Sequence, residues 1–282
     1  MKPGGRASSL RWEITVPSAW AASTKTRWIC PLPTGRTSTA TTSARCPKLR
    51  AARAAGFDNL SLDFLYGLPG QTLARWRETL SAALALQPEH LSLYALTVEE
   101  GTPLATQIAA GRLPAPDPDR AAEMYELAEE TLATAGFEHY EISNWARPGY
   151  ACRHNLVYWR NEPWLGLGAG AASWWGGRRW SHVRHPADYI ARVQAEGSAV
   201  EELEEIPPRL EMGETMMLGL RLAEGVSDAR FRARFDQGLE ATFGSELAAL
   251  RDLGLLEWDG QVARLTARGR LLGNQVFQQF LP

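Results

Sequence analysis

The chain of 282 residues has few cysteines and no long hydrophobic run. Its three cysteines, Cys30, Cys46 and Cys152, have no close pairing, which argues against a disulfide scaffold and favours a reducing compartment. No stretch approaches the ~20 apolar residues that a membrane span requires. No apolar run follows Lys2 as it would in a secretory signal. We therefore expect a soluble, cytoplasmic protein.

An excess of either charge is also missing. The sequence has 30 Lys and Arg against 32 Asp and Glu, a formal net charge of −2. After residue 50 the two signs are mixed along the chain, so the sequence gives no electrostatic signal for a nucleic-acid partner. Its hydrophobic content of 45% is sufficient for ordinary cores, and its length allows about two domains.

The first fifty residues do not have the composition of a folded domain. They contain nine Lys or Arg, fourteen Ser or Thr and five Pro, but one acidic residue, Glu13. No apolar period of 2 or 3.6 persists in them. A disrupted reading frame, an organelle transit peptide or a disordered tail would each give this composition. We predict that residues 1–48 are a disordered or out-of-frame segment.

Residues 49–113 have the pattern of an α/β unit. Helical residues end at Gly56, a buried strand is predicted over 60–66, and a turn follows at 67–70. A helix over 72–86 carries apolar residues on one face, and a second strand covers 91–96. A strand, a helix and a strand in this order predict a parallel βαβ unit. We place Asp63 in the carboxyl-terminal half of the first strand, where its carboxylate could accept a hydrogen bond from a ribose hydroxyl.

Residues 114–206 begin with the proline-rich linker 114–118, and Asp119 is the predicted N-cap of a helix over 120–135. Six of the eleven tryptophans lie between residues 137 and 200. They could form a packed core or the wall of a pocket. Within this region the run 152–159 combines a histidine, an amide and two large aromatic side chains, a set that could hold a flat apolar ring. A histidine beside aromatic residues is also common as a hydrogen-bonded core or cap residue.

Residues 207–282 predict a separate module. Helices are expected over 210–222, 227–234 and 239–253. A hairpin over 255–265 turns at Asp259-Gly260, and Thr266 caps a last helix that runs through Gln279. Helices followed by a hairpin are typical of a winged-helix-like α+β domain. Because no helix here is strongly basic, we expect a packing or partner-docking role.

Four motifs occur in an order typical of one family: Asn59–Thr72 with Asp63 inside it, Leu91–Leu96, Tyr140–Asn144, and His154-Asn-x-x-Tyr-Trp159. On these motifs the chain resembles, from about Leu49 to Pro282, the HemW family of haem chaperones. These are radical S-adenosylmethionine (SAM) proteins related to oxygen-independent coproporphyrinogen III oxidase. The resemblance implies an α/β fold: the carboxyl-terminal part of a partial (βα)6 radical-SAM barrel, followed by the winged-helix-like domain.

The resemblance also implies ligands. Haem would be bound and delivered to an acceptor protein, which could lie at a membrane, and the family's cofactors are SAM and a [4Fe-4S] cluster. The implied haem-binding residues are His154, Asn155, Tyr158 and Trp159, with His139, His182 and His185 as other axial candidates. The implied SAM contacts are Asp63, Ala95 and Ala172. Ala172 departs from the histidine that haem chaperones often carry at that position.

The family's Cys-x-x-x-Cys-x-x-Cys motif is not in this sequence. Three thiolates are required to hold the cluster, so we expect no bound [4Fe-4S] cluster and no cluster ligands in this chain. A transit peptide would precede such a motif instead of replacing it, which favours a disrupted frame. Two alternatives to a chaperone stay open. One is a radical-SAM oxidase-like oxidoreductase, and the other is a non-functional fragment with an exposed edge strand beginning at Leu60.

Overall fold

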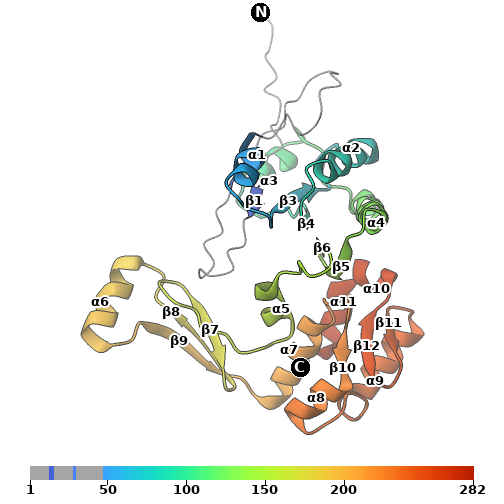
Figure 1. Ribbon diagram of the computed structural model, residues 1–282. Helices are drawn as coiled ribbons and strands as arrows, with labels where there is room; N and C mark the ends of the chain where they lie inside the picture. The colour runs from blue at the N-terminus through green and yellow to red at the C-terminus, as the bar shows by residue number, and fades with distance from the viewer. Residues whose placement is uncertain (1–12, 16–27, 30–46) are drawn as a thin grey trace, which may run out of the picture. The chain divides into compact units, whose positions relative to one another are not determined.

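The structure is a computed structural model that describes residues 13–15, 28–29 and 47–282, and contacts divide the chain into two units, residues 1–151 and 152–282 (Figure 1). This division falls inside the predicted segment 114–206. The predicted boundaries at residues 48, 113 and 206 remain predictions. Most of the segment 1–48 lies outside the described residues.

The first unit is a mixed sheet with helices. Its elements are β1 (Glu13–Thr15), β2 (Trp28–Ile29), α1 (Pro47–Ala54), β3 (Ser61–Tyr66), α2 (Leu73–Leu84), β4 (His90–Ala95), α3 (Pro103–Ala109), α4 (Pro118–Thr134), β5 (Glu138–Glu141) and β6 (Asn144–Ala146). The strand order is β2-β1-β3-β4-β6-β5. β3 and β4 are parallel and joined through α2, which confirms the predicted βαβ unit, while the other pairs are antiparallel. Among the described strands the sheet does not close into a barrel.

The prediction of an exposed edge strand beginning at Leu60 is wrong. β1 pairs antiparallel with β3, so Ile14 lies opposite Leu62 and the backbone of β3 has a partner on both sides. The prediction assumed that the first fifty residues contribute no strand. A three-residue strand is too short to leave a recognisable period in the sequence.

The two faces of the sheet differ because side chains alternate along each strand. Leu62, Phe64 and Tyr66 are buried on one face, where they join Trp76 of α2 and Met124 of α4 in the core of the unit. Trp76 is fully buried, and its indole Nε1 donates to the Met124 carbonyl at 2.8 Å. Burial raises the pKa of Tyr66 to about 12. The opposite face of β3 and β4 is mostly polar, apart from the exposed Leu65.

The N-caps of α2 and α4 are Thr72 and Asp117, and the predicted cap of α4, Asp119, is wrong. The Thr72 hydroxyl accepts from the Arg75 backbone N–H, as expected of an N-cap. For α4 the cap is Asp117, whose carboxylate accepts from two backbone N–H groups, and not Asp119. Pro118 then occupies the first helical position, where its missing N–H costs nothing.

The second unit contains two three-stranded sheets. Its elements are α5 (Arg153–Trp159), β7 (Ala172–Trp175), β8 (Arg178–His182), α6 (Pro186–Glu196), β9 (Val200–Glu205), α7 (Pro208–Gly219), β10 (Val226–Ser227), α8 (Asp228–Phe235), α9 (Leu239–Asp252), β11 (Leu256–Trp258), β12 (Val262–Leu265), α10 (Ala267–Leu271), α11 (Gly273–Phe277) and the 3-10 helix η2 (Gln278–Phe280). The sheets have the orders β7-β8-β9 and β10-β12-β11. The second sheet with α7, α8 and α9 forms the predicted winged-helix-like module (Figure 1).

The predicted hairpin and helix cap of this module are confirmed, but its last helix is not continuous. Asp259 closes the hairpin turn by accepting from the Gln261 and Val262 backbone N–H groups, and Thr266 caps α10. The expected single helix to Gln279 is three short segments, α10, α11 and η2, because the chain bends at Leu272 (φ −105°, ψ 24°).

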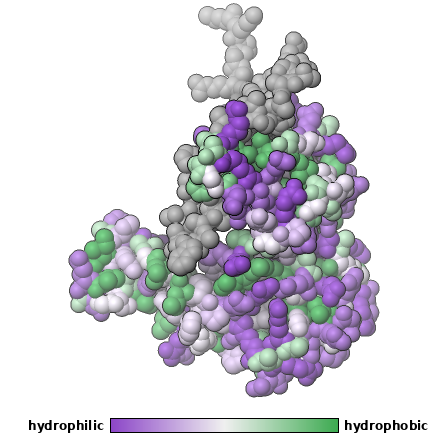
Figure 2. Space-filling model, in the orientation of Figure 1, coloured by the Kyte–Doolittle hydropathy of each residue, from purple (hydrophilic) through white to green (hydrophobic). Residues whose placement is uncertain are grey.

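The sheet of β7, β8 and β9 has an unusually exposed outer strand. All six residues of β9 are exposed, four of them are glutamates, and β8 is the one strand with which β9 pairs in the described part of the chain. Nearby α6 buries none of its residues, and its Ile190 is 55% exposed. Hydrophobic surface is visible on this lobe in Figure 2. Within the described ranges no helix is both long and apolar enough to cross a membrane.

Candidate functional site

The histidine of the predicted haem-binding run lies on α5, a helix of seven residues. His154 and Tyr158 are four residues apart, so they lie on the same face of the helix. Their rings meet edge to face with centroids 4.8 Å apart, and the His154 side chain is exposed. The helix therefore presents an imidazole to solvent with an aromatic ring packed behind it.

Two tryptophans continue this contact away from the helix. Tyr158 lies edge to face with Trp164 at 5.0 Å, and Trp164 stacks on Trp174 of β7 at 6.1 Å. Trp164 and Trp174 also exchange backbone hydrogen bonds of 2.9 Å in both directions. We call His154, Tyr158, Trp164 and Trp174 the aromatic row. It runs from an exposed imidazole to Trp174, which is 3% exposed.

Trp159, predicted to form one apolar wall with Tyr158, lies elsewhere. One residue along a helix turns the side chain by roughly 100°, so Trp159 leaves the face of His154. Its ring lies 5.3 Å from the Arg221 guanidinium, and its carbonyl approaches Gly219 of α7. The structure thus brings Tyr158 to His154 and places Trp159 against α7. Asn155, which follows His154 on α5, is partly buried.

The glycine-rich segment after α5 brings two backbone segments together. A Cβ at Gly166 would lie 2.1 Å from the carbonyl oxygen of Ala172. The Gly166 N–H donates to the Ser173 hydroxyl at 2.9 Å. A glycine is therefore required at position 166 because the backbone there packs directly against β7. Ala172, a predicted SAM contact, begins β7 and its side chain is exposed.

The other axial candidates differ in their surroundings. His139 stacks on Trp145 at 4.5 Å and lies 3.3 Å from the Tyr125 hydroxyl, so its ring is part of the first unit's core. His182 lies 3.3 Å from the Gly168 carbonyl. His185, before α6, is exposed and lies 3.9 Å from Asp188. Of the four candidate histidines, His154 is the one that is both exposed to solvent and part of the aromatic row.

In the first unit a polar row crosses the sheet beside the predicted SAM contacts. Asp63 of β3 lies opposite Ser92 of β4, and Ser92 lies opposite Asn144 of β6. The buried Glu141 carboxylate accepts from the Asn144 amide and, at 3.0 Å, from the Ser143 backbone N–H. Asp63 is the third of six residues in β3, earlier in the strand than predicted. Ala95, the other predicted contact, ends β4.

Tyr94 projects from the same face as this polar row. Partial burial raises the pKa of its phenol, the Ser92 hydrogen bond opposes that rise, and the Asp63 and Glu141 carboxylates add to it. The Asn144 side chain is also within hydrogen-bonding reach. A carboxylate, a phenol and a hydroxyl therefore converge on one face, and together they can bind a cationic ligand that carries hydroxyl groups.

Among the residues that the structure describes there is one cysteine, Cys152, so no cluster of thiolates is seen there. Cys152 precedes α5 and is a free thiol, whereas Cys30 and Cys46 lie outside the described residues. The described ranges hold no group of three or more His, Cys, Asp or Glu side chains placed to bind a metal ion. Because the sequence has no Cys-x-x-x-Cys-x-x-Cys motif, the residues of this chain do not fit the family's cluster.

Comparisons with known proteins agree with the motifs. Residues 206–272 match the model of the HemN C-terminal domain. The chain is 40% identical to the heme chaperone HemW of Bacillus subtilis over 230 residues, which cover 82% of the chain and 61% of that relative. It is 39% identical to the heme chaperone HemW of Mycobacterium tuberculosis over 230 residues, covering 82% of the chain and 57% of the relative. The mitochondrial radical S-adenosyl methionine domain-containing protein 1 of mouse is 34% identical over 260 residues, which cover 88% of the chain and 58% of that relative.

A solved structure supports the fold. The chain aligns with coproporphyrinogen III oxidase (HemN) from Escherichia coli, a radical SAM enzyme, with a TM-score of 0.63 and 23% identity over 82% of the chain and 57% of the enzyme. The mixed α/β architecture is that of part of this fold. The chain spans about three fifths of the length of the curated relatives named above.

Proposed function

Because this chain is a HemW-like member of the radical SAM family, we propose that it binds haem at the aromatic row and passes it to an acceptor protein. The observation that carries the proposal is the exposed His154 imidazole with Tyr158 packed behind it at 4.8 Å. An imidazole nitrogen is a common axial ligand of haem iron, and aromatic rings bury the apolar surface of the macrocycle.

The position of His154 suits transfer as well as binding. A histidine on the exposed side of a short helix would leave a bound haem accessible to an acceptor. Trp164 and Trp174, at the other end of the row, support Tyr158. Haem held through one protein nitrogen would leave by ligand exchange.

We predict that His154→Ala removes the axial ligand, so the Soret band shifts and haem affinity falls by about tenfold or more, equivalent to at least ~1.4 kcal/mol. The measurement is a titration with ferric haem followed by absorbance. His185→Ala is the matched control, because it removes an exposed histidine of the same unit that lies outside the aromatic row. A spectrum of His154→Ala identical to wild type, with only a lowered melting temperature, would show that His154 has a packing role.

A second candidate function is binding of SAM by the first unit, and the polar row favours it. The Asp63 carboxylate could accept from a ribose hydroxyl, Tyr94 and Ser92 could orient polar groups, and Ala95 could contact the ligand through its backbone. The sulfonium of SAM is a cation, so the carboxylates of Asp63 and Glu141 attract it. When bound, SAM would supply a methyl or adenosyl group, and the residues of the sheet would only bind and orient it.

We predict that Asp63→Asn weakens SAM binding about tenfold or more, because a hydrogen bond to a charged group contributes about 1.5–3 kcal/mol. Isothermal titration with SAM measures the change. Asp58→Asn is the control, since Asp58 is exposed in the loop before β3. Equal affinity in Asp63→Asn and wild type would remove Asp63 from the proposed site.

A further inference from the structure

One arginine of the winged-helix-like module contacts both elements that carry the aromatic row. Arg234 of α8 donates from Nη1 to the Asn161 carbonyl at 2.7 Å, just beyond the end of α5. Its guanidinium carbon also lies 5.0 Å from the centre of the Trp174 ring on β7. We propose that Arg234 is a positioning residue that sets His154 for haem binding, an inference that rests on the proposed function.

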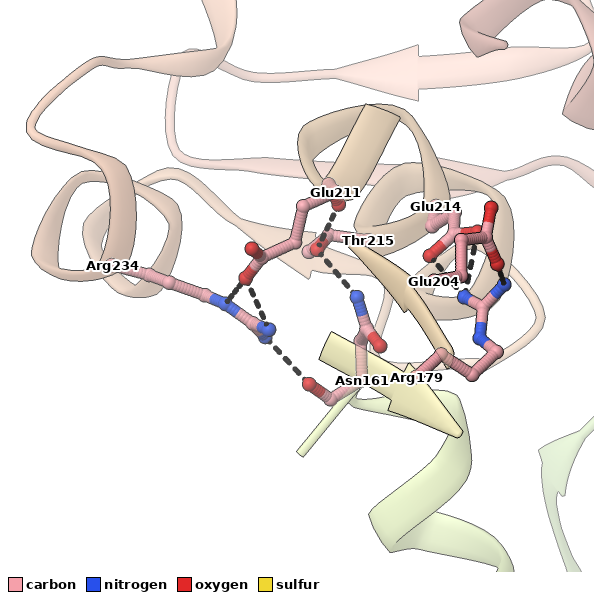
Figure 3. A network of polar contacts seen from close by, with 7 residues as sticks. All are labelled: Asn161, Arg179, Glu204, Glu211, Glu214, Thr215 and Arg234. Carbon is pink, nitrogen blue, oxygen red and sulfur yellow. Dashed lines mark hydrogen bonds and ion pairs between the residues drawn. The ribbon is translucent and has the colours of Figure 1, made fainter. Parts of the chain in front are cut away.

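The first step of the argument is the end of α5. Asn161 is 1% exposed, has a positive φ of 50°, and donates from its side-chain amide to the Thr215 hydroxyl of α7 at 3.1 Å. Its carbonyl accepts from Arg234. Figure 3 shows these contacts reaching Asn161 from two helices, α7 and α8. Because α5 has only seven residues, fixing its last turn also fixes the direction of His154.

The second step is the buried end of the row. Trp174 is held from one side by Trp164 and is in cation–π contact with Arg234. The Trp164–Trp174 stack in turn supports Tyr158, which packs against His154. The guanidinium therefore links the end of α5 directly to β7. If the Arg234 side chain is removed, both the end of α5 and the Trp174 ring lose a contact that holds the aromatic row together.

The third step is the charge of Arg234. Its side chain is 26% exposed, and Glu211 of α7 accepts from Nε at 3.0 Å and from Nη2 at 2.7 Å. The guanidinium thus uses one edge for Glu211, a third nitrogen for Asn161 and its flat face for Trp174. A lysine has neither the planar face nor the fixed fork of donors, so it cannot make the three contacts together.

A neighbouring arginine shows that this role is not shared by every ion pair of the unit. Arg179 of β8 binds Glu214 of α7 at 2.7 Å and Glu204 of β9 at 3.4 Å, as seen in Figure 3. These contacts fasten the β7-β8-β9 sheet to α7. None of these contacts reaches α5, whereas Arg234 contacts both the residue after α5 and Trp174.

The test is a ferric haem titration of Arg234→Met, Arg234→Lys and the control Arg232→Met. Arg232 lies on the same helix, its side chain is 59% exposed, and it pairs with Asp228. Arg234 acts on His154 through Asn161 and Trp174, so we expect Arg234→Met to weaken haem binding by about tenfold, the lower end of the effect of a supporting group at a metal site, and to shift the Soret band towards that of His154→Ala. Arg234→Lys should not restore the wild-type spectrum, and Arg232→Met should match wild type.

Circular dichroism and thermal melts accompany each titration. If Arg234→Met does not fold, Arg234→Lys carries the test, since lysine keeps the charge beside Glu211 and lacks the planar fork that reaches Asn161 and Trp174. A wild-type haem spectrum and affinity in the folded Arg234 variant, while His154→Ala is altered, would overturn the positioning role alone. An unaltered His154→Ala would instead overturn the proposed haem ligand, and the positioning role with it.

Discussion

Trp76→Ala is expected to lower the free energy of unfolding by about 3–5 kcal/mol. Trp76 is fully buried in the core of the first unit and lies 5.5 Å from the Tyr66 ring. The substitution leaves a cavity between α2, α4 and the sheet, and it leaves the Met124 carbonyl without the indole N–H that it now accepts. Denaturation by urea, followed by circular dichroism, measures the change.

Two controls separate the contributions. Trp76→Phe keeps much of the ring volume and loses the hydrogen bond to Met124, so it should cost less than the alanine variant. Trp175→Ala makes the same truncation at a side chain that is 58% exposed, and it should change stability by no more than about 0.5 kcal/mol. Similar losses for Trp76→Ala and Trp175→Ala would contradict the packing described here.

Gly225→Ala is expected to destabilise the winged-helix-like module by about 2–5 kcal/mol. Gly225 has a φ of 72°, which costs a residue with a Cβ about 1–2 kcal/mol. The added Cβ would also lie 2.2 Å from the Ala263 carbonyl oxygen, so β10 must move away from β12. Such overpacking costs a further ~1–3 kcal/mol.

Gly254→Ala is the matched control for the collision with Ala263. Gly254 has a φ of 68°, close to that of Gly225, but a Cβ there would meet no atom within 4 Å. The control should therefore show the backbone cost of about 1–2 kcal/mol without the collision. Equal unfolding free energies for the two variants, measured by denaturant titration, would mean that β10 can move away from β12 without a measurable loss of stability.

Much of the secondary structure is readable from local signals. The βαβ unit follows from two short apolar runs with a periodic helix between them. In the winged-helix-like module, the Asp259-Gly260 turn marks the hairpin of β11 and β12. These signals depend on a few adjacent residues. The α4 cap was misassigned because Asp117 and Asp119 both precede the apolar period, and the choice depended on Pro118 fitting the first turn. The antiparallel pairing of β1 depends on tertiary contacts that leave no mark in a three-residue strand.

The candidate site was predictable only in part. The spacing of His154 and Tyr158 places them on one helical face, and the same rule separates Trp159 from them once the segment is known to be helical. The contacts of Trp164 with Trp174, and of Arg234 with both, join residues that are distant in the sequence. No periodicity connects such positions, so reading the sequence missed Arg234 and Asn161.

The exposed strand β9 has a consequence for how the protein behaves at high concentration. If two copies met along β9, their glutamates would stand opposite one another, and like charges directly across a strand pair repel. The protection is electrostatic, and salt screens charges that are exposed to solvent. High ionic strength would therefore weaken this barrier and leave the unpaired edge of β9 free to pair with a second copy, so low-salt buffers are the conditions under which the protein can be concentrated.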